Sequence, residues 1–73
     1  MRKLSRAIEL YRRLLKEDPF QEVAHRELMR CYYRQGDRAA AIRQYQACII
    51  MLRDELGLMP SPETDELYLH IIR

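Results

Sequence analysis

Residues 41–49, AIRQYQACI, repeat the pattern of residues 7–15, AIELYRRLL. Three residues of the first stretch recur 34 positions later in the second: Ala7 as Ala41, Ile8 as Ile42 and Tyr11 as Tyr45. A repeat of this length is typical of helix–turn–helix units, each of which buries its apolar face only by stacking on a neighbour. The sequence therefore predicts stacked pairs of helices.

Four segments carry apolar residues at the three- and four-residue spacing of an amphipathic helix. The predicted helices are residues 4–17, 21–35, 38–56 and 62–72. No segment shows the sustained alternation of a strand. The expected fold class is all-α, with four helices stacked as antiparallel pairs, and the expected domain organisation is a single unit over residues 1–73.

Turn and capping residues mark the ends of these helices. Pro19 disfavours the helical conformation at the residue before it and ends the first helix. Gly36 and Gly57 are suited to the left-handed turns that close the second and third helices. Asp37 is a candidate N-cap for the third helix, and Ser61 is a candidate N-cap for the fourth.

Charge is divided unevenly along the chain of 73 residues. Residues 1–43 hold 11 Lys and Arg against 6 Asp and Glu, whereas residues 44–73 hold 2 against 5. The folded unit should therefore have a positive and a negative end, which suits a polar or head-to-tail protein partner. A solvated surface of uneven charge is the alternative.

No group of residues points to catalysis, a metal or a cofactor. Cys31 and Cys48 lie on apolar stripes, where packing is the ordinary role of a free thiol. His25 and His70 lack a second ligand at metal spacing, and His25 is expected to pack between helices. Without a secretory signal or a disulfide pattern, a cytoplasmic, non-enzymatic protein is expected.

The repeat resembles the tetratricopeptide repeat, which implies that residues 1–73 are a fragment of a tetratricopeptide-like domain whose helix pairs stack in a right-handed superhelix. In the second helix of that repeat, a small residue, an aromatic residue and a closing proline follow one another in the order seen at Ala7, Tyr11 and Pro19. The second copy departs from the pattern, because Arg53 occupies the place of its proline. Met29 also replaces the small residue that is usual in the first helix of a unit.

A closer resemblance rests on residues 14–46, LLKEDPFQEVAHRELMRCYYRQGDRAAAIRQYQ, followed by residues 52–64, LRDELGLMPSPET. These segments look like the C-terminal half of the bacterial transcriptional activator domain. In that family the domain follows a winged helix-turn-helix DNA-binding domain and serves protein–protein contact, often self-association. The resemblance implies an interaction and oligomerisation module of a transcriptional regulator, which reaches DNA only through a domain outside this chain.

Two candidate surfaces follow from the resemblance. The first helix of each tetratricopeptide unit faces a concave groove, so a partner-binding groove for an acidic segment is expected at Val23, Arg26, Arg30, Tyr33 and Arg34. A solvated face, partly neutralised by Glu22 and Glu27, is the alternative. Residues 4–17 resemble the second helix of a unit whose first helix is missing, as in an excised fragment, so a self-association surface is expected at Leu4, Ile8, Leu10 and Tyr11.

Two other functions stay open at this point. One is a general repeat adaptor that is unrelated to transcription. The other is weak direct contact with DNA phosphates through the basic residues of the N-terminal segment: Arg2, Lys3, Arg6, Arg12, Arg13 and Lys16.

Overall fold

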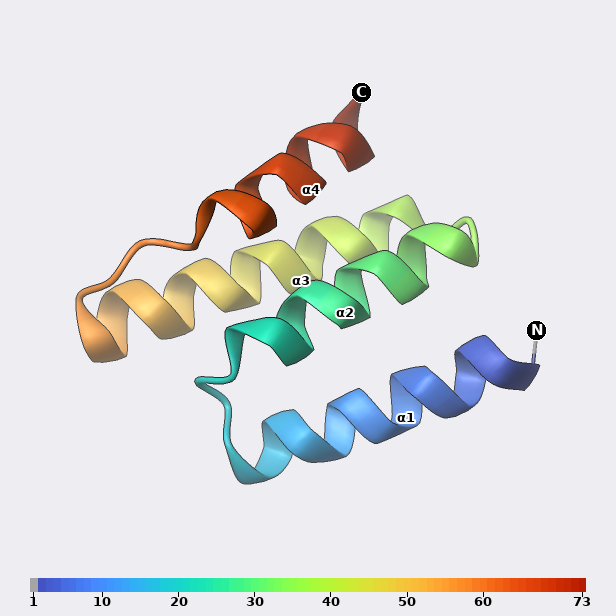
Figure 1. The fold of residues 1–73 in the computed structure, drawn as a ribbon, viewed down its shortest axis with the longest axis horizontal. Helices are drawn as coiled ribbons and strands as arrows, with labels where there is room; N and C mark the ends of the chain where they lie inside the picture. Colours follow the sequence, from blue (N-terminus) through green and yellow to red (C-terminus); the bar gives the residue numbers. More distant parts are fainter. Residues whose placement is uncertain (1) are drawn as a thin grey trace.

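The computed structural model describes residues 2–73, which form four α-helices and one short π-helical turn, with no strand among them. The elements are α1 (Arg2–Glu17), α2 (Glu22–Arg34), α3 (Arg38–Ile50), η1 (Met51–Glu55) and α4 (Pro62–Ile72). The helices lie side by side in a slab of 36 × 31 × 17 Å (Figure 1). This confirms the predicted all-α class and the predicted four helices, whereas the handedness of the superhelix stays a prediction.

The chain runs up and down through the slab, and α2 occupies its centre. Among the described elements, α2 packs against α1, α3 and α4, whereas α1 packs against α2 alone (Figure 1). None of these helices has the length and apolar character needed to cross a bilayer.

The ends of the helices follow the predicted turn residues. Gly36 adopts a φ of 82°, and the amide of Asp37 donates to the carbonyl of Tyr32 at 2.9 Å, so the two residues close α2. The Asp37 carboxylate then caps α3 by accepting from the amide of Ala40 at 3.0 Å. Gly57, with a φ of 65°, ends the longer helix formed by α3 and η1.

The predicted third helix, residues 38–56, differs in its last turn. The α-helix ends at Ile50, and Met51–Glu55 continue it as a wider π-helical turn. A single turn of different pitch does not repeat, so it leaves no periodic signal in the spacing of apolar residues.

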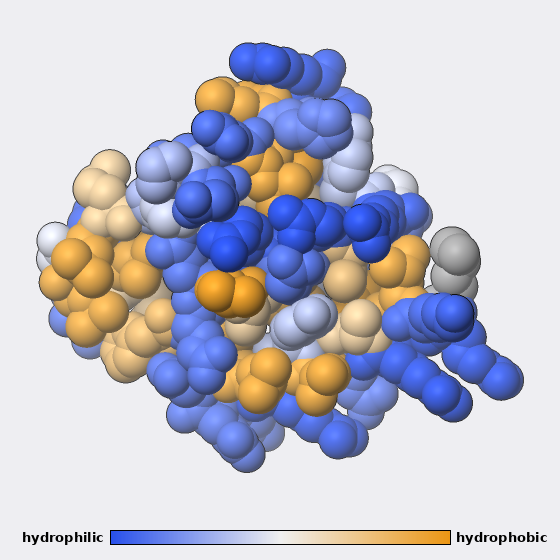
Figure 2. All heavy atoms as spheres, in the orientation of Figure 1, coloured by the Kyte–Doolittle hydropathy of each residue, from blue (hydrophilic) through white to orange (hydrophobic). Residues whose placement is uncertain are grey.

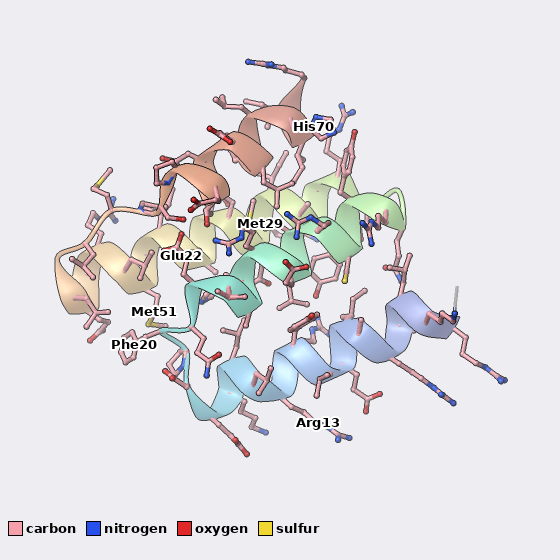
Figure 3. The ribbon with its side chains drawn as sticks, in the orientation of Figure 1. Arg13, Phe20, Glu22, Met29, Met51 and His70 are labelled. Atoms are coloured by element: carbon pink, nitrogen blue, oxygen red, sulfur yellow. The ribbon has the colours of Figure 1, made fainter. Side chains whose placement is uncertain are left out.

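Two small apolar clusters hold the slab together, and α2 contributes to both. Ile8 of α1 packs with Leu28 and Cys31 of α2 in the first cluster. In the second cluster, Met29 of α2 lies fully buried with Ala41 of α3 and Ile71 of α4 (Figure 3). Because α2 contributes side chains to both clusters, its contacts fix the positions of α1, α3 and α4.

The small residue of the repeat is essential to the second cluster. Ala41 has no exposed surface, so a larger side chain there must push α3 away from its neighbours. We expect Ala41→Leu to lower the free energy of unfolding by about 1–3 kcal/mol, measured by urea denaturation. The matched control is Ala47→Leu, because Ala47 is exposed on the same helix. Equal stability of the two variants would show that close packing at Ala41 is not required.

Candidate functional site

The N-terminus of α4 is held by a carboxylate from another helix. Oε2 of Glu22, at the start of α2, accepts a hydrogen bond from the Ser61 amide at 2.8 Å and another from the Ser61 hydroxyl at 2.7 Å. The Thr64 hydroxyl donates to the same oxygen. Glu22 points towards α4 in Figure 3. It therefore supplies the negative charge that favours the N-terminal end of a helix dipole.

Arg26, one turn along α2, completes this cluster. Its Nη1 donates to the Thr64 hydroxyl at 3.2 Å and to the Ser61 hydroxyl at 3.5 Å, and lies 4.0 Å from Oε2 of Glu22. Burial by itself would raise the pKa of Glu22, but the hydrogen bonds from Thr64 and Ser61, together with Arg26, outweigh burial and lower that pKa below its usual value of 4.5. The Glu22 carboxylate is thus held in its ionised form.

The side of α4 that faces α3 is fixed by an aromatic contact. The rings of Tyr45 and Tyr68 stack with their centroids 3.9 Å apart and their planes 10° from parallel. The Tyr45 hydroxyl donates to Oδ1 of Asp65 at 2.8 Å. Burial and the neighbouring Asp65 carboxylate raise the pKa of Tyr45 to about 12, so this hydroxyl stays protonated and keeps donating.

His25 links α3 to the turn between α1 and α2. The amide of Gln44 donates to Nδ1 of His25 at 2.8 Å, so the protonated Nε2 donates to the carbonyl of Pro19 at 2.9 Å. The ring is buried and both of its nitrogens are occupied. This confirms the prediction that His25 packs between helices.

The two cysteines are free and buried. Burial raises the pKa of the Cys31 thiol, and it raises that of Cys48 to about 11. Thiolate is the reactive form of cysteine, so both side chains behave as packing groups at neutral pH. The residues described include no group of three or more side chains arranged to hold a metal ion.

Two shallow depressions on the described part of the surface have volumes of about 420 and 270 Å³. The larger one lies where the start of α1 meets the α2–α3 turn, and the smaller one lies between α1 and α3. Arginine, glutamine and aspartate side chains line both depressions, with Leu4 in the larger one and with Tyr32 and Ala40 in the smaller one.

The five predicted groove residues divide into two groups. Val23 and Arg34 are exposed on α2, and the half-buried Arg30 forms an ion pair with Glu27. Arg26 and Tyr33 instead turn to α4. Arg26 binds the hydroxyl groups described above, and Tyr33 makes an edge-to-face contact with His70, with ring centroids 5.5 Å apart.

The predicted self-association surface has to be corrected at Ile8. Its side chain is buried against Leu28 and Cys31 because the stripe that carries it faces α2. Leu4 and Tyr11 are partly buried against the same cluster. Leu10 is 55% exposed and is the member of the set that clearly faces outwards.

The hydroxyl and carboxylate cluster at α4 was not predicted. A capping box pairs a Ser or Thr N-cap with Glu or Gln three residues later, but here Thr64 occupies that third position after Ser61. The acid comes from Glu22 across the fold, and the Ser61 hydroxyl turns to it without capping its own helix. The signal in the sequence was Thr64, a hydroxyl residue at the position where a capping box has its acid, because it indicates that the acid comes from elsewhere.

Comparison with known proteins gives one family. Residues 2–72 match the family model described as the bacterial transcriptional activator domain. No curated protein and no solved structure gave a match. The match covers nearly the whole chain, including the segment that carries the cluster at α4.

We expect Glu22→Gln to lower the free energy of unfolding by about 1–2 kcal/mol at neutral pH, since it removes charge-assisted hydrogen bonds at a partly buried site. The wild-type carboxylate contributes stability above its unfolded pKa and loses that contribution as pH falls through the lowered folded pKa. The difference between the two proteins should therefore shrink below pH 4.5.

The matched control for this measurement is Glu55→Gln, because Glu55 is exposed in η1. Both variants are compared with the wild type by thermal unfolding across the acid range. If Glu22→Gln and Glu55→Gln behave alike at every pH, Glu22 does not hold α4.

Proposed function

Because the chain belongs to the bacterial transcriptional activator domain family, and so serves bacterial transcriptional regulation, we propose that it is a non-catalytic protein-interaction module. The family match favours this role over a general adaptor that is unrelated to transcription. The same match makes the cytoplasm the expected location, and any contact with DNA is proposed to pass through a domain outside these residues.

The observation that carries the proposal is the free side of α2. This central helix is held on three sides by α1, α3 and α4. Its remaining side carries Val23, Arg30 and Arg34, with Val23 57% exposed. A rigid helix with one open side can present these groups at low entropic cost, because its neighbours already order its backbone.

The chemistry of this side suits an acidic, partly apolar segment. Arginine binds a carboxylate through two parallel hydrogen bonds, and Val23 offers apolar contact. Arg30 is already paired with Glu27, so an incoming carboxylate has to compete with that neighbour. Tyr33 and His70 form an aromatic border towards α4. The proposed docking face is therefore Val23, Arg30 and Arg34, bordered by Tyr33, and Arg26 serves to hold α4.

Direct DNA contact has less support from α1. Its basic residues are exposed, but Glu9 lies among them and pairs with Arg13 at 3.1 Å. This ion pair lowers the positive charge available to phosphates.

The test of the docking face is binding of a fluorescent glutamate-rich peptide, followed by anisotropy at low and physiological salt. Arg30→Glu should weaken binding by about tenfold or more, because it replaces a carboxylate-binding group with a repelling charge. The matched control is Arg53→Glu, since Arg53 also pairs with a neighbouring carboxylate, Asp54, but lies in η1. Unchanged binding by Arg30→Glu, or an equal loss in both variants, would contradict the proposal.

A further inference from the structure

The smaller of the two surface depressions, of about 270 Å³, lies between α1 and α3. Among the described elements, α2 packs against both of these helices, and they do not pack against each other (Figure 1). The side chains that line the depression come from all three helices and from the turn before α3: Arg12, Tyr32, Asp37, Ala40, Arg43 and Gln44. Because α2 holds α1 and α3 in place, the two sides of the depression are held at a fixed separation.

Two arginines that line this depression have no acceptor inside the chain. Arg12 of α1 and Arg43 of α3 are both exposed. Over residues 2–73 neither guanidinium forms an ion pair or a side-chain hydrogen bond, unlike Arg13, which pairs with Glu9. Like charges that line one depression repel each other, so an anion bound there relieves that repulsion and also gains two attractive partners.

Tyr32 adds a third donor, from α2. Its ring packs against both apolar clusters, which fixes the position of its hydroxyl. Within the part of the chain that the structure describes, this hydroxyl has no hydrogen-bond partner, and it is not shut off from solvent. A donor that is already held in place loses little freedom when a ligand binds.

Donors from three helices suit a phosphate group better than a carboxylate. A carboxylate offers two oxygens and a single charge, whereas a phosphate monoester offers three terminal oxygens and a charge of about −1.5 to −2 at pH 7. Arginine binds phosphate through two parallel hydrogen bonds, as it does a carboxylate. Two guanidinium groups and one hydroxyl therefore provide enough donors for all three phosphate oxygens.

Asp37 is the acid among the residues that line the depression. Its Oδ1 accepts from the Ala40 amide at 3.0 Å as the cap of α3, so the positive end of the helix dipole balances part of its charge. The rest of that charge opposes an anion. Asp37 therefore sets an upper limit on affinity that a neutral side chain at the same position should raise.

The depression is polar, and a large group of exposed apolar side chains lies elsewhere. Figure 2 shows apolar atoms over η1 and the loop before α4, at the left end of the molecule. Leu58 is 54% exposed and Met59 is 78% exposed in this loop. A ligand held mainly by apolar contacts therefore has a better surface than the depression, which suits a small and strongly charged ligand.

We propose that Arg12, Tyr32 and Arg43 form a binding site for the phosphate group of a small molecule. The site goes beyond the proposed protein-interaction role, because none of these residues belongs to the docking face of α2. It also differs from a contact with duplex DNA, since each phosphodiester carries one charge and two terminal oxygens, and the phosphates follow one another in a line.

The test is an NMR titration of the isotope-labelled chain at constant ionic strength, followed at the backbone amides and the arginine Nε–H groups. The probes are phenyl phosphate, inorganic phosphate and benzoate. Phenyl phosphate should shift the signals of Arg12 and Arg43 and bind about fivefold or more tightly than benzoate. Equal affinities for phenyl phosphate and benzoate, or no shift at these arginines, would overturn the proposal. Inorganic phosphate that binds as tightly as phenyl phosphate assigns the site to free phosphate, and weaker binding assigns it to a monoester.

Four variants test the geometry, and circular dichroism checks that each keeps its helices. Arg12→Gln and Arg43→Gln should each weaken binding of phenyl phosphate by about fivefold or more. Asp37→Asn should strengthen it by about twofold or more, because asparagine keeps the helix cap and removes the repelling charge. The matched control is Arg13→Gln, which removes the same charge from the next residue of α1 and should bind like the wild type. An equal loss in Arg12→Gln and Arg13→Gln would show a general attraction to positive charge and contradict a defined site.

Two further measurements separate this site from other ligands. Duplex DNA at an equal concentration of phosphate groups should not displace phenyl phosphate, and displacement would assign the arginines to the DNA backbone instead. The glutamate-rich peptide should bind to Arg43→Gln as it does to the wild type. Failure of peptide docking and failure of phosphate binding therefore give separate results.

Discussion

The N-terminus of α4 is held on the central helix by one carboxylate, that of Glu22. A helix begins with amide groups that have no partner inside the helix, and α4 begins after a loop that offers no acid of its own at the third position. Glu22 fills that need from the first turn of α2, where it accepts from Ser61 and Thr64. Arg26 offsets its charge. This cluster of polar groups thus ties the start of α4 to the central helix, and the buried Ile71 beside Met29 ties its later turns.

The sequence predicted the parts of the fold that leave periodic or positional signals. The four apolar stripes, the turns at Gly36 and Gly57 and the cap at Asp37 all reappear in the structure. The wide turn of η1 was missed because it occurs once. The cluster at α4 was missed because its acid lies 39 residues before Ser61, and spacing along a chain does not reveal contacts between separate helices.

The candidate site was harder to predict for a related reason. A helical stripe identifies which residues share a side, but it does not say which neighbour covers that side. Arg26 was predicted to line an open groove, yet its side chain binds the Thr64 hydroxyl of α4. Ile8 was assigned to an open surface, yet α2 covers it. Among the residues described, one side of α2 keeps the exposed residues Val23 and Arg34 and the half-buried Arg30.

Hydrogen exchange followed residue by residue tests the central claim, that Glu22 holds α4 on the rest of the fold. In Glu22→Ala, the amides of α4 should lose protection by about tenfold or more relative to the wild type, while those of α2 and α3 keep theirs, since α4 then opens separately. Unchanged protection of α4, or an equal loss in all helices, would contradict the claim.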